Sequence, residues 1–411
     1  MNRWLFWWRS VRSELWVRAT LYAAAAIAAA LLAVIGAPFV PKAVAERLGG
    51  DSVGSILTIL ASSLLGVATF SAGVMVTAYT AVSQATTPRV AALITSDSQV
   101  QKALATFVGA FLYAIVAVTA ANANYYGQEG RAILFLFSLV VVGLVAFRLL
   151  AWINHLSSLA RVGHMIDLVE EHARAALRER RKAPYLGGHS GHIRSAFTVV
   201  ADESGYVQNV DPARLQEIAE EHDCQVEVMA QPGDYVRRGD PLANLSAHDC
   251  SKAVCEEFRS AFAIGGQRSF DQDPRFGLIV LGEIAAKALS PGVNDPGTAI
   301  QVMGAAVRAL DEWATLAPDG GPGAVRYSRL WAAPIDDEEM VADVFGPPAR
   351  FGAADVVVAV RLQKMLHKLR RDEGPLATAA GRQSKEALAR ARLALTLPED
   401  IVRVEQAART G

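Results

Sequence analysis

The sequence contains little cysteine, and long parts of its N-terminal half carry no formal charge. Among 411 residues there are three cysteines, Cys224, Cys250 and Cys255, all in the C-terminal half. Their odd number argues against a disulfide framework, and their spacing fits no zinc-binding pattern. Unpaired thiols are typical of a reducing compartment, so we expect this half of the chain to lie in the cytosol.

Recognisable catalytic patterns are also missing. The sequence has no phosphate-cradling glycine loop, no His-Glu-x-x-His zinc pattern and no Ser-His-Asp order. Its formal net charge of −1 gives no reason to expect nucleic-acid binding. We therefore expect a protein that is not an enzyme, that holds no cofactor or metal, and that binds no nucleic acid.

Four stretches within the first 160 residues lack formal charge and are rich in Ala, Val, Leu and Ile. A helix needs about 20 apolar residues to cross a bilayer core, and a helix satisfies its own backbone polar groups there. We predict a four-helix transmembrane domain over 19–160, with spans at about 19–40, 53–80, 103–123 and 132–154. Residues 1–18 mix tryptophan with arginine, which predicts an interfacial amphipathic segment. The alternative is that their apolar face packs on another helix.

Basic residues favour a cytosolic location for both chain ends. Arginines and lysines are concentrated before the first span, between the second and third spans, and after the fourth. Because cytosolic loops carry an excess of Lys and Arg, this pattern predicts an even number of spans. We expect a multi-pass protein of the bacterial inner membrane, embedded in the lipid bilayer.

The second predicted span differs from the others because small and hydroxyl residues recur along one side of it. This candidate pore or helix-packing face consists of Ser62, Gly66, Thr69, Gly73, Thr77 and Thr80. Small residues let helices approach closely, which is the commoner cause of such a pattern, but the same face could line a narrow aqueous pore. Thr86, Thr87 and Arg89 follow the span and are the candidate inner mouth of such a pore. The span has no ionisable residue at mid-membrane, which argues against a proton relay.

The remaining residues, 161–411, have a soluble composition and predict a mixed α+β cytosolic domain. Short alternating strands and glycine turns predict a small β module at about 195–245, and a helical region follows at about 250–400. The turns after Gln231 resemble those of biotinyl and lipoyl carriers. No lysine occurs between Lys182 and Lys252, so the resemblance supports a β module without a swinging arm.

Residues 270–300 hold the most distinctive motif. Asp273 and Asp295 are placed to cap two helices, which predicts a helical hairpin with a polar elbow. Oxygen atoms in this elbow could bind a hard cation, or helix-start donors an anion. The simpler interpretation is that these residues only form turns and caps. The candidate ligand or interface residues are Asp271, Asp273, Glu283, Asn294, Asp295 and Thr298.

Two sequence blocks resemble a bacterial family of predicted membrane proteins, domain of unknown function 2254. The first block is Ser71–Val90, which contains Val-Ser-Gln-Ala-Thr-Thr-Pro-Arg-Val. The second begins at Gln272-Asp-Pro-Arg-Phe-Gly and continues to Ala288-Leu-Ser-Pro-Gly-Val-Asn-Asp-Pro-Gly-Thr-Ala. The resemblance covers nearly the entire chain and implies an inner-membrane protein with four spans followed by a soluble domain. It brings no reaction, substrate or site residue with it.

The sequence leaves two functions open. The first is a homo-oligomeric, channel-like protein in which the second span lines a path and the cytosolic domain gates or filters. The second is a non-conducting membrane scaffold or sensor whose cytosolic domain binds a partner or small ligand through the elbow. Neither the permeant ion nor the protein partner is specified by the residues.

Overall fold

The computed structural model describes residues 52–95, 98–123, 126–159, 161–247, 250–317, 321, 324–371 and 373–410, with scattered positions from 17 to 45. The chain separates into two compact units, one ending at Arg161 and the other starting at Val162. The predicted interfacial segment 1–18, apart from position 17, and much of the predicted span 19–40 lie outside the described residues.

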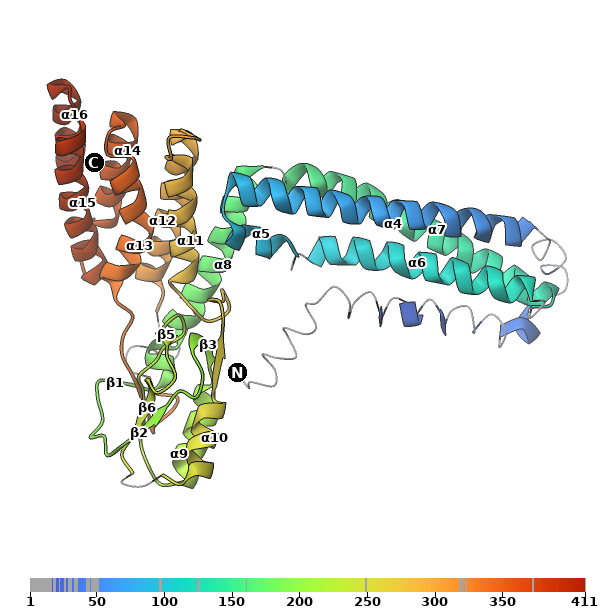
Figure 1. Cartoon of the computed structure of the whole chain (residues 1–411), viewed down its shortest axis with the longest axis horizontal. Helices are drawn as coiled ribbons and strands as arrows, with labels where there is room; N and C mark the ends of the chain where they lie inside the picture. The colour runs from blue at the N-terminus through green and yellow to red at the C-terminus, as the bar shows by residue number, and fades with distance from the viewer. Residues whose placement is uncertain are drawn as a thin grey trace. The chain divides into compact units, whose positions relative to one another are not determined.

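The N-terminal unit is helical (Figure 1). Three of its helices are long and apolar enough to cross a membrane, over Val53–Ala85, Gln99–Asn122 and Gln128–Leu156. They correspond to the predicted second, third and fourth spans, so the described residues support three of the four spans. The elements are η1 Ala37–Phe39, α4 Ser52–Ala85, α5 Pro88–Thr95, α6 Ser98–Asn122 and α7 Gln128–Leu159.

Apolar residues of α4 and α6 form the core of this unit. Leu57 is fully buried in a cluster that also contains Tyr113 and Leu134. The Tyr113 hydroxyl donates to the Leu134 carbonyl at 3.2 Å and lies 3.3 Å from the Ser138 hydroxyl. Because a buried hydroxyl is costly without a partner, these contacts hold α6 against α7 at a defined position.

The C-terminal unit contains two small sheets. A five-stranded sheet has the order β1-β8-β4-β6-β2, and a three-stranded sheet has the order β5-β3-β7. The strands are β1 His189–Ser190, β2 Phe197–Val200, β3 Gly205–Val210, β4 Val226–Val228, β5 Tyr235–Val236, β6 Pro241–Leu245, β7 Phe262–Gly265 and β8 Leu330–Ala332.

The two sheets draw on residues beyond the predicted module of 195–245. β8 lies between β1 and β4 and pairs in parallel with both, although its residues 330–332 lie far beyond the predicted module. β7, at residues 262–265, also lies beyond the predicted module and pairs with β3 in the smaller sheet. Val226, Leu330 and Leu245 pack in the core below the larger sheet, so this core closes only when the distant strand is in place.

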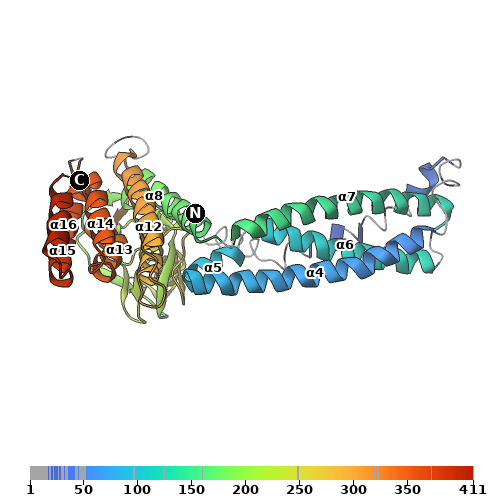
Figure 2. The same cartoon turned by 90° about the horizontal axis from the view of Figure 1, so that it is seen from above.

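Helices make up the rest of the C-terminal unit. They are α8 Val162–Lys182, α9 Pro212–Glu221, α10 Lys252–Ser260, α11 Phe276–Ala288, α12 Pro296–Thr315, α13 Asp337–Phe351, α14 Val356–Leu369, α15 Pro375–Ala394 and α16 Pro398–Thr410, with a short η2 Pro184–Gly187. α11 and α12 form the predicted hairpin, and α14, α15 and α16 lie side by side (Figure 2). The run Val356–Val360, which is compatible with either a strand or a short buried helix, begins helix α14.

Candidate functional site

The small-residue face of α4 is exposed along its whole length. Each of its members is solvent-exposed in the single chain, whereas Leu57, Leu64 and Ser71 on the same helix are buried. At about 3.6 residues per turn, these two sets fall on opposite sides of the helix. A Cβ atom added at Gly66 or Gly73 would meet no described atom within 4 Å. The face therefore has no packing partner among the described parts of this chain.

The hydroxyl groups on this face bond to their own helix. Ser62 donates to the Thr58 carbonyl at 3.0 Å, and Thr77 donates to the Gly73 carbonyl at 3.1 Å. Thr69 and Thr80 donate in the same way to carbonyls one turn earlier. Because each hydroxyl is satisfied within α4, the face can pack against another helix or contact water without an unpaired donor.

The candidate inner mouth is divided between buried and exposed side chains. Thr86 is fully buried and donates to the Val82 carbonyl at 2.7 Å, which ends α4. Thr87 is also buried, and its hydroxyl has no hydrogen-bond partner among the described residues. Arg89 is exposed on α5. The two threonines thus form the turn between α4 and α5, and Arg89 is the residue of the three that solvent can reach.

The first part of the predicted elbow is a buried carboxylate beside the start of α11. Asp273 is 1% exposed, and its Oδ1 accepts hydrogen bonds from the amides of Arg275 and Phe276 at the start of α11. Its other oxygen accepts from Arg268 Nε at 2.7 Å. Asp271 is exposed and bonds to Ser269. The predicted helix start at about Pro274 with Asp273 as its cap is not observed, because α11 begins at Phe276 with Arg275 at the N-cap position and no side-chain cap. Asp273 instead bonds the amides that lead into the helix, and its carboxylate is occupied by protein donors.

The second part of the elbow lies at the opposite end of α11. Asp295 caps α12, as predicted, by accepting from the Thr298 amide at 3.1 Å and the Thr298 hydroxyl at 2.6 Å. These hydrogen bonds lower the pKa of Asp295. Asn294 precedes it with a left-handed φ of 51°. α11 has 13 residues, so a length of about 20 Å separates this turn from Asp273, and half-buried Glu283 lies between them. The structure therefore does not bring the six predicted residues into one site.

Two glycines of the same motif have a packing role that the sequence did not reveal. A Cβ at Gly277 would lie 2.4 Å from Ala173 Cβ on α8, and one at Gly282 would lie 2.4 Å from the Asp343 carbonyl on α13. α11 therefore needs glycine at both positions to approach two neighbouring helices. The sequence signal for this close packing was the pair of glycines five residues apart in an apolar helix. That signal does not identify the helices, α8 and α13, that approach them.

A charged network joins α8 to the hairpin and to the β module. Glu170 is buried and receives Arg308 and Arg174, and Glu312 receives Arg174 and Arg178. Two residues after Arg178 on the same helix, Arg180 donates to Gln231 Oε1 at 2.6 Å. Burial lowers the pKa of Arg180 to about 10, and Asp273 and Asp234 oppose that shift. These contacts fix α8, the helix that follows α7 in the chain, within the C-terminal unit.

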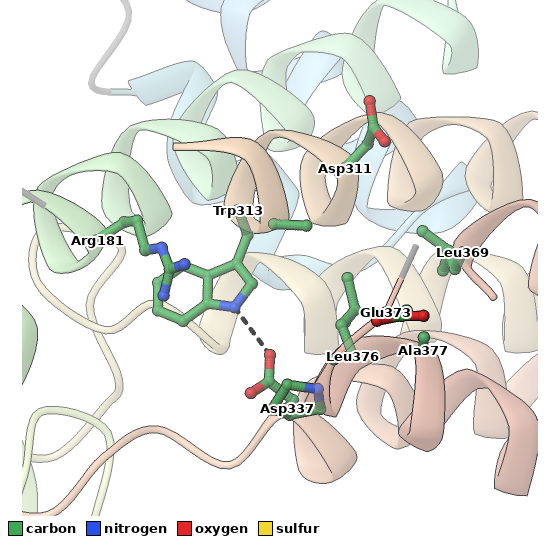
Figure 3. Close-up of a pocket in the computed structure, with 11 residues that line it drawn as sticks. Arg181, Asp311, Trp313, Asp337, Leu369, Glu373, Leu376 and Ala377 are labelled. Atoms are coloured by element: carbon green, nitrogen blue, oxygen red, sulfur yellow. Dashed lines mark hydrogen bonds between the residues drawn. The ribbon is translucent and has the colours of Figure 1, made fainter. Parts of the chain in front are cut away.

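A candidate pocket that the sequence did not predict surrounds Trp313 (Figure 3). The Trp313 indole donates to Asp337 Oδ1 at 2.9 Å, and the Arg181 guanidinium lies 5.1 Å from its ring centre. The cavity has a volume of about 170 Å³ and combines an aromatic surface with charges of both signs. Its other lining residues include Asp311, Leu369, Glu373, Leu376 and Ala377.

One group in the described part of the chain has the geometry to hold a metal ion. Ligand atoms of Glu221, His222 and Glu257 lie within 4.8 Å of one another. Glu221 and His222 are exposed, and Glu257 lies 3.6 Å from Arg214. A metal would have to compete with this arginine, so the group carries no proposal.

Comparison with known proteins gives a family and two similar bacterial proteins. A family profile described as "Predicted membrane protein (DUF2254)" matches residues 12–368. An uncharacterized protein of Mycobacterium tuberculosis strain H37Rv is 36% identical over 113 residues, which are 26% of this chain and 22% of that protein. An uncharacterized protein of Mycobacterium bovis matches to the same extent. The matched segment thus spans about a fifth of the length of these relatives. No solved structure matches the chain.

Proposed function

The chain belongs to the DUF2254 family of predicted membrane proteins, and from this premise we propose that it is a homo-oligomeric, channel-like protein of the bacterial inner membrane. In this proposal the α4 helices of several copies face a common axis. The C-terminal unit lies in the cytosol and gates or filters the path. The observation that carries the proposal is the small, hydroxyl-bearing face of α4, which is exposed opposite its packed side.

The contrast between α4 and α7 supports this assignment. The exposed side of α7 is formed mainly by large apolar residues: Leu139 is 62% exposed, Phe147 64% and Leu150 69%. α4 also exposes large residues such as Ile59 and Phe70, but its exposed side carries the six small and hydroxyl residues as well. Large apolar side chains suit contact with lipid tails, whereas glycine, serine and threonine suit close contact with helices or water. We therefore assign α7 to the lipid boundary and the small face of α4 to the subunit contact and the path.

Ion flux tests the conducting role. The full-length protein is reconstituted in liposomes, and ion flux is measured with and without osmotic tension. Gly73→Leu should change the flux at least severalfold because it places a bulky side chain on the proposed path. Gly143→Leu on α7 is the matched control, since Gly143 is also exposed and also has no described atom near its Cβ position. Absence of flux in the assembled wild-type protein, or equal effects of the two variants, would count against a channel.

Cysteine crosslinking tests the subunit contact separately. Gly73→Cys should form a disulfide between copies under mild oxidation, because the small faces meet. Tyr79→Cys is an exposed control about 120° around α4 from Gly73, where Tyr79 is 38% exposed. The unmodified chain controls for its three native cysteines. Crosslinking through Tyr79→Cys but not through Gly73→Cys would refute the proposed packing.

The Trp313 pocket favours a second candidate function, a sensor whose C-terminal unit binds a small ligand. Asp311, Asp337 and Glu373 supply negative charge, and Arg181 supplies positive charge, around one aromatic ring. This combination suits a small molecule that carries an amino group together with an acidic group. Free amino acids are the probe: one that raises the melting temperature of the wild-type protein but not of Asp337→Asn would support the sensor. If no amino acid stabilises the wild-type protein, this candidate fails.

A further inference from the structure

A small cavity lies at one end of the membrane helices, where α7 passes the beginning of α6. It is lined by Gln99, Ala103, Arg148, Ala151, Trp152 and His155. Its volume is about 10 Å³, which is enough for one water-sized atom. All six residues belong to the N-terminal unit.

Two lining residues present buried donors that have no acceptor among the described residues. Trp152 is 2% exposed, and its Nε1 has no hydrogen-bond partner among the residues the structure describes. The Nε atom of Arg148 is buried and likewise has no described partner. An indole and a guanidinium can only donate, so a group that pairs with both of these atoms must be an acceptor. Because Arg148 is positively charged, an anionic acceptor fits better than a neutral one.

The position of the cavity indicates the source of that acceptor. Arg148 ends the charge-free run that starts after Arg131, a helical length of about 25 Å. Such a length brings Arg148 to the boundary of the hydrocarbon core. Phe147, Leu150 and Ile153 are 64%, 69% and 54% exposed on the same stretch of α7, so lipid chains can contact the helix beside the cavity. Tryptophan and arginine together are typical of the headgroup level.

We propose that this cavity binds the phosphate group of an anionic phospholipid. One phosphate oxygen enters the cavity and accepts hydrogen bonds from Trp152 Nε1 and Arg148 Nε. The rest of the headgroup stays at the membrane surface, and the acyl chains lie along the exposed residues of α7. The site is separate from the small face of α4 and does not depend on conduction.

The test compares lipids on the purified full-length protein in detergent. Phosphatidylglycerol, phosphatidylcholine and inorganic phosphate are added separately, and bound lipid is counted by native mass spectrometry while thermal stability is recorded. Phosphatidylglycerol should be retained and should raise the melting temperature, with a smaller effect of phosphatidylcholine and none of inorganic phosphate. Arg148→Gln should weaken retention of phosphatidylglycerol by about tenfold, in line with the loss of one charge-assisted hydrogen bond.

Three further variants keep the proposal falsifiable if Arg148→Gln folds poorly. Arg148→Lys keeps the positive charge and should retain part of the preference for phosphatidylglycerol. Trp152→Phe keeps an aromatic ring but loses the Nε1 donor, so it should weaken that preference. Arg131→Gln, at the other end of α7, should leave the preference for phosphatidylglycerol unchanged. Equal retention of both lipids by the wild-type protein would overturn the assignment to an anionic lipid. Lipid retention that neither Arg148→Gln nor Trp152→Phe changes would overturn phosphate binding altogether and identify the cavity as a water site. Full stabilisation by inorganic phosphate alone would overturn the lipid assignment in favour of a free anion.

Discussion

Replacement of Gly277 by alanine should loosen the contact between α8 and α11. The added Cβ would lie 2.4 Å from Ala173 Cβ and 2.7 Å from Ala173 Cα. The first distance is about 1 Å shorter than ordinary van der Waals contact, which begins at 3.4 Å. Because the second neighbour is a backbone atom, a rotamer change cannot relieve the clash, and the two helices must separate.

The magnitude follows from two opposing effects. Overpacking of a well-filled core costs about 1–3 kcal/mol, and alanine gains about 0.5–1 kcal/mol over glycine within a helix. The net destabilisation should be roughly 1–2 kcal/mol, which corresponds to a factor of about 5–30 in the local opening equilibrium. Gly304→Ala on α12 is the matched control, since its Cβ would meet only Arg308 Nη1 at 3.6 Å. That variant should gain about 0.5–1 kcal/mol.

Hydrogen exchange of the full-length protein in detergent measures this effect where it arises. Peptides from α8 and α11 should exchange about 5–30 times faster in Gly277→Ala than in the wild-type protein. The same peptides should exchange no faster in Gly304→Ala. Unchanged protection in Gly277→Ala would refute the argument, because it would mean that α8 and α11 are not in close contact through Ala173. Equal acceleration in both variants would show that any alanine in this hairpin is disruptive.

The remaining predictions concern caps and charges of the C-terminal unit. Asp295→Ala should lower the unfolding free energy by about 1 kcal/mol through loss of the α12 cap, and Asp295→Asn should recover most of it in a denaturant titration. Burial raises the pKa of Glu312, but its hydrogen bonds to Arg178 and Arg174 outweigh burial and lower it overall. The stabilisation from Glu312 is therefore present above its unfolded pKa of about 4.3 and is lost as the pH falls through its lower folded pKa. In Glu312→Gln the free energy of unfolding should consequently fall less steeply as the pH is lowered through this range. Trp313→Phe removes the hydrogen bond to Asp337 and should lower the melting temperature, whereas Trp331→Phe, whose ring stacks on His189 at 4.6 Å, has no such bond to lose.

Features that depend on local sequence could be predicted. The spans at 53–80, 103–123 and 132–154 could be predicted from their lack of charged residues, because a charged side chain inside the bilayer core is energetically costly. The cap at Asp295 follows from a residue next to the helix that it begins. The grouping of small residues on one side of α4 could also be anticipated, since these residues repeat at helical spacing, but their exposure in the single chain could not.

Features that depend on distant contacts could not be predicted. β8 has three residues, too few for a periodic signal, and its parallel partners are more than 100 positions away. The Trp313 pocket needs residues from α8, α12, α13, α14 and α15. The elbow residues are close in sequence, yet the rigid length of α11 keeps its two ends apart. Sequence proximity was therefore misleading for this motif.

The late arrival of β8 has a consequence for biosynthesis. A chain growing from the ribosome can complete β1, β4, β6 and β2 well before residues 330–332 are made. Until then β1 and β4 have exposed edges, and such edges invite pairing with other chains. Nascent chains that stall before β8 should therefore be prone to aggregation and to proteolysis. Because β8 lies between β1 and β4, the five-stranded sheet can be completed only after residue 332 has been translated.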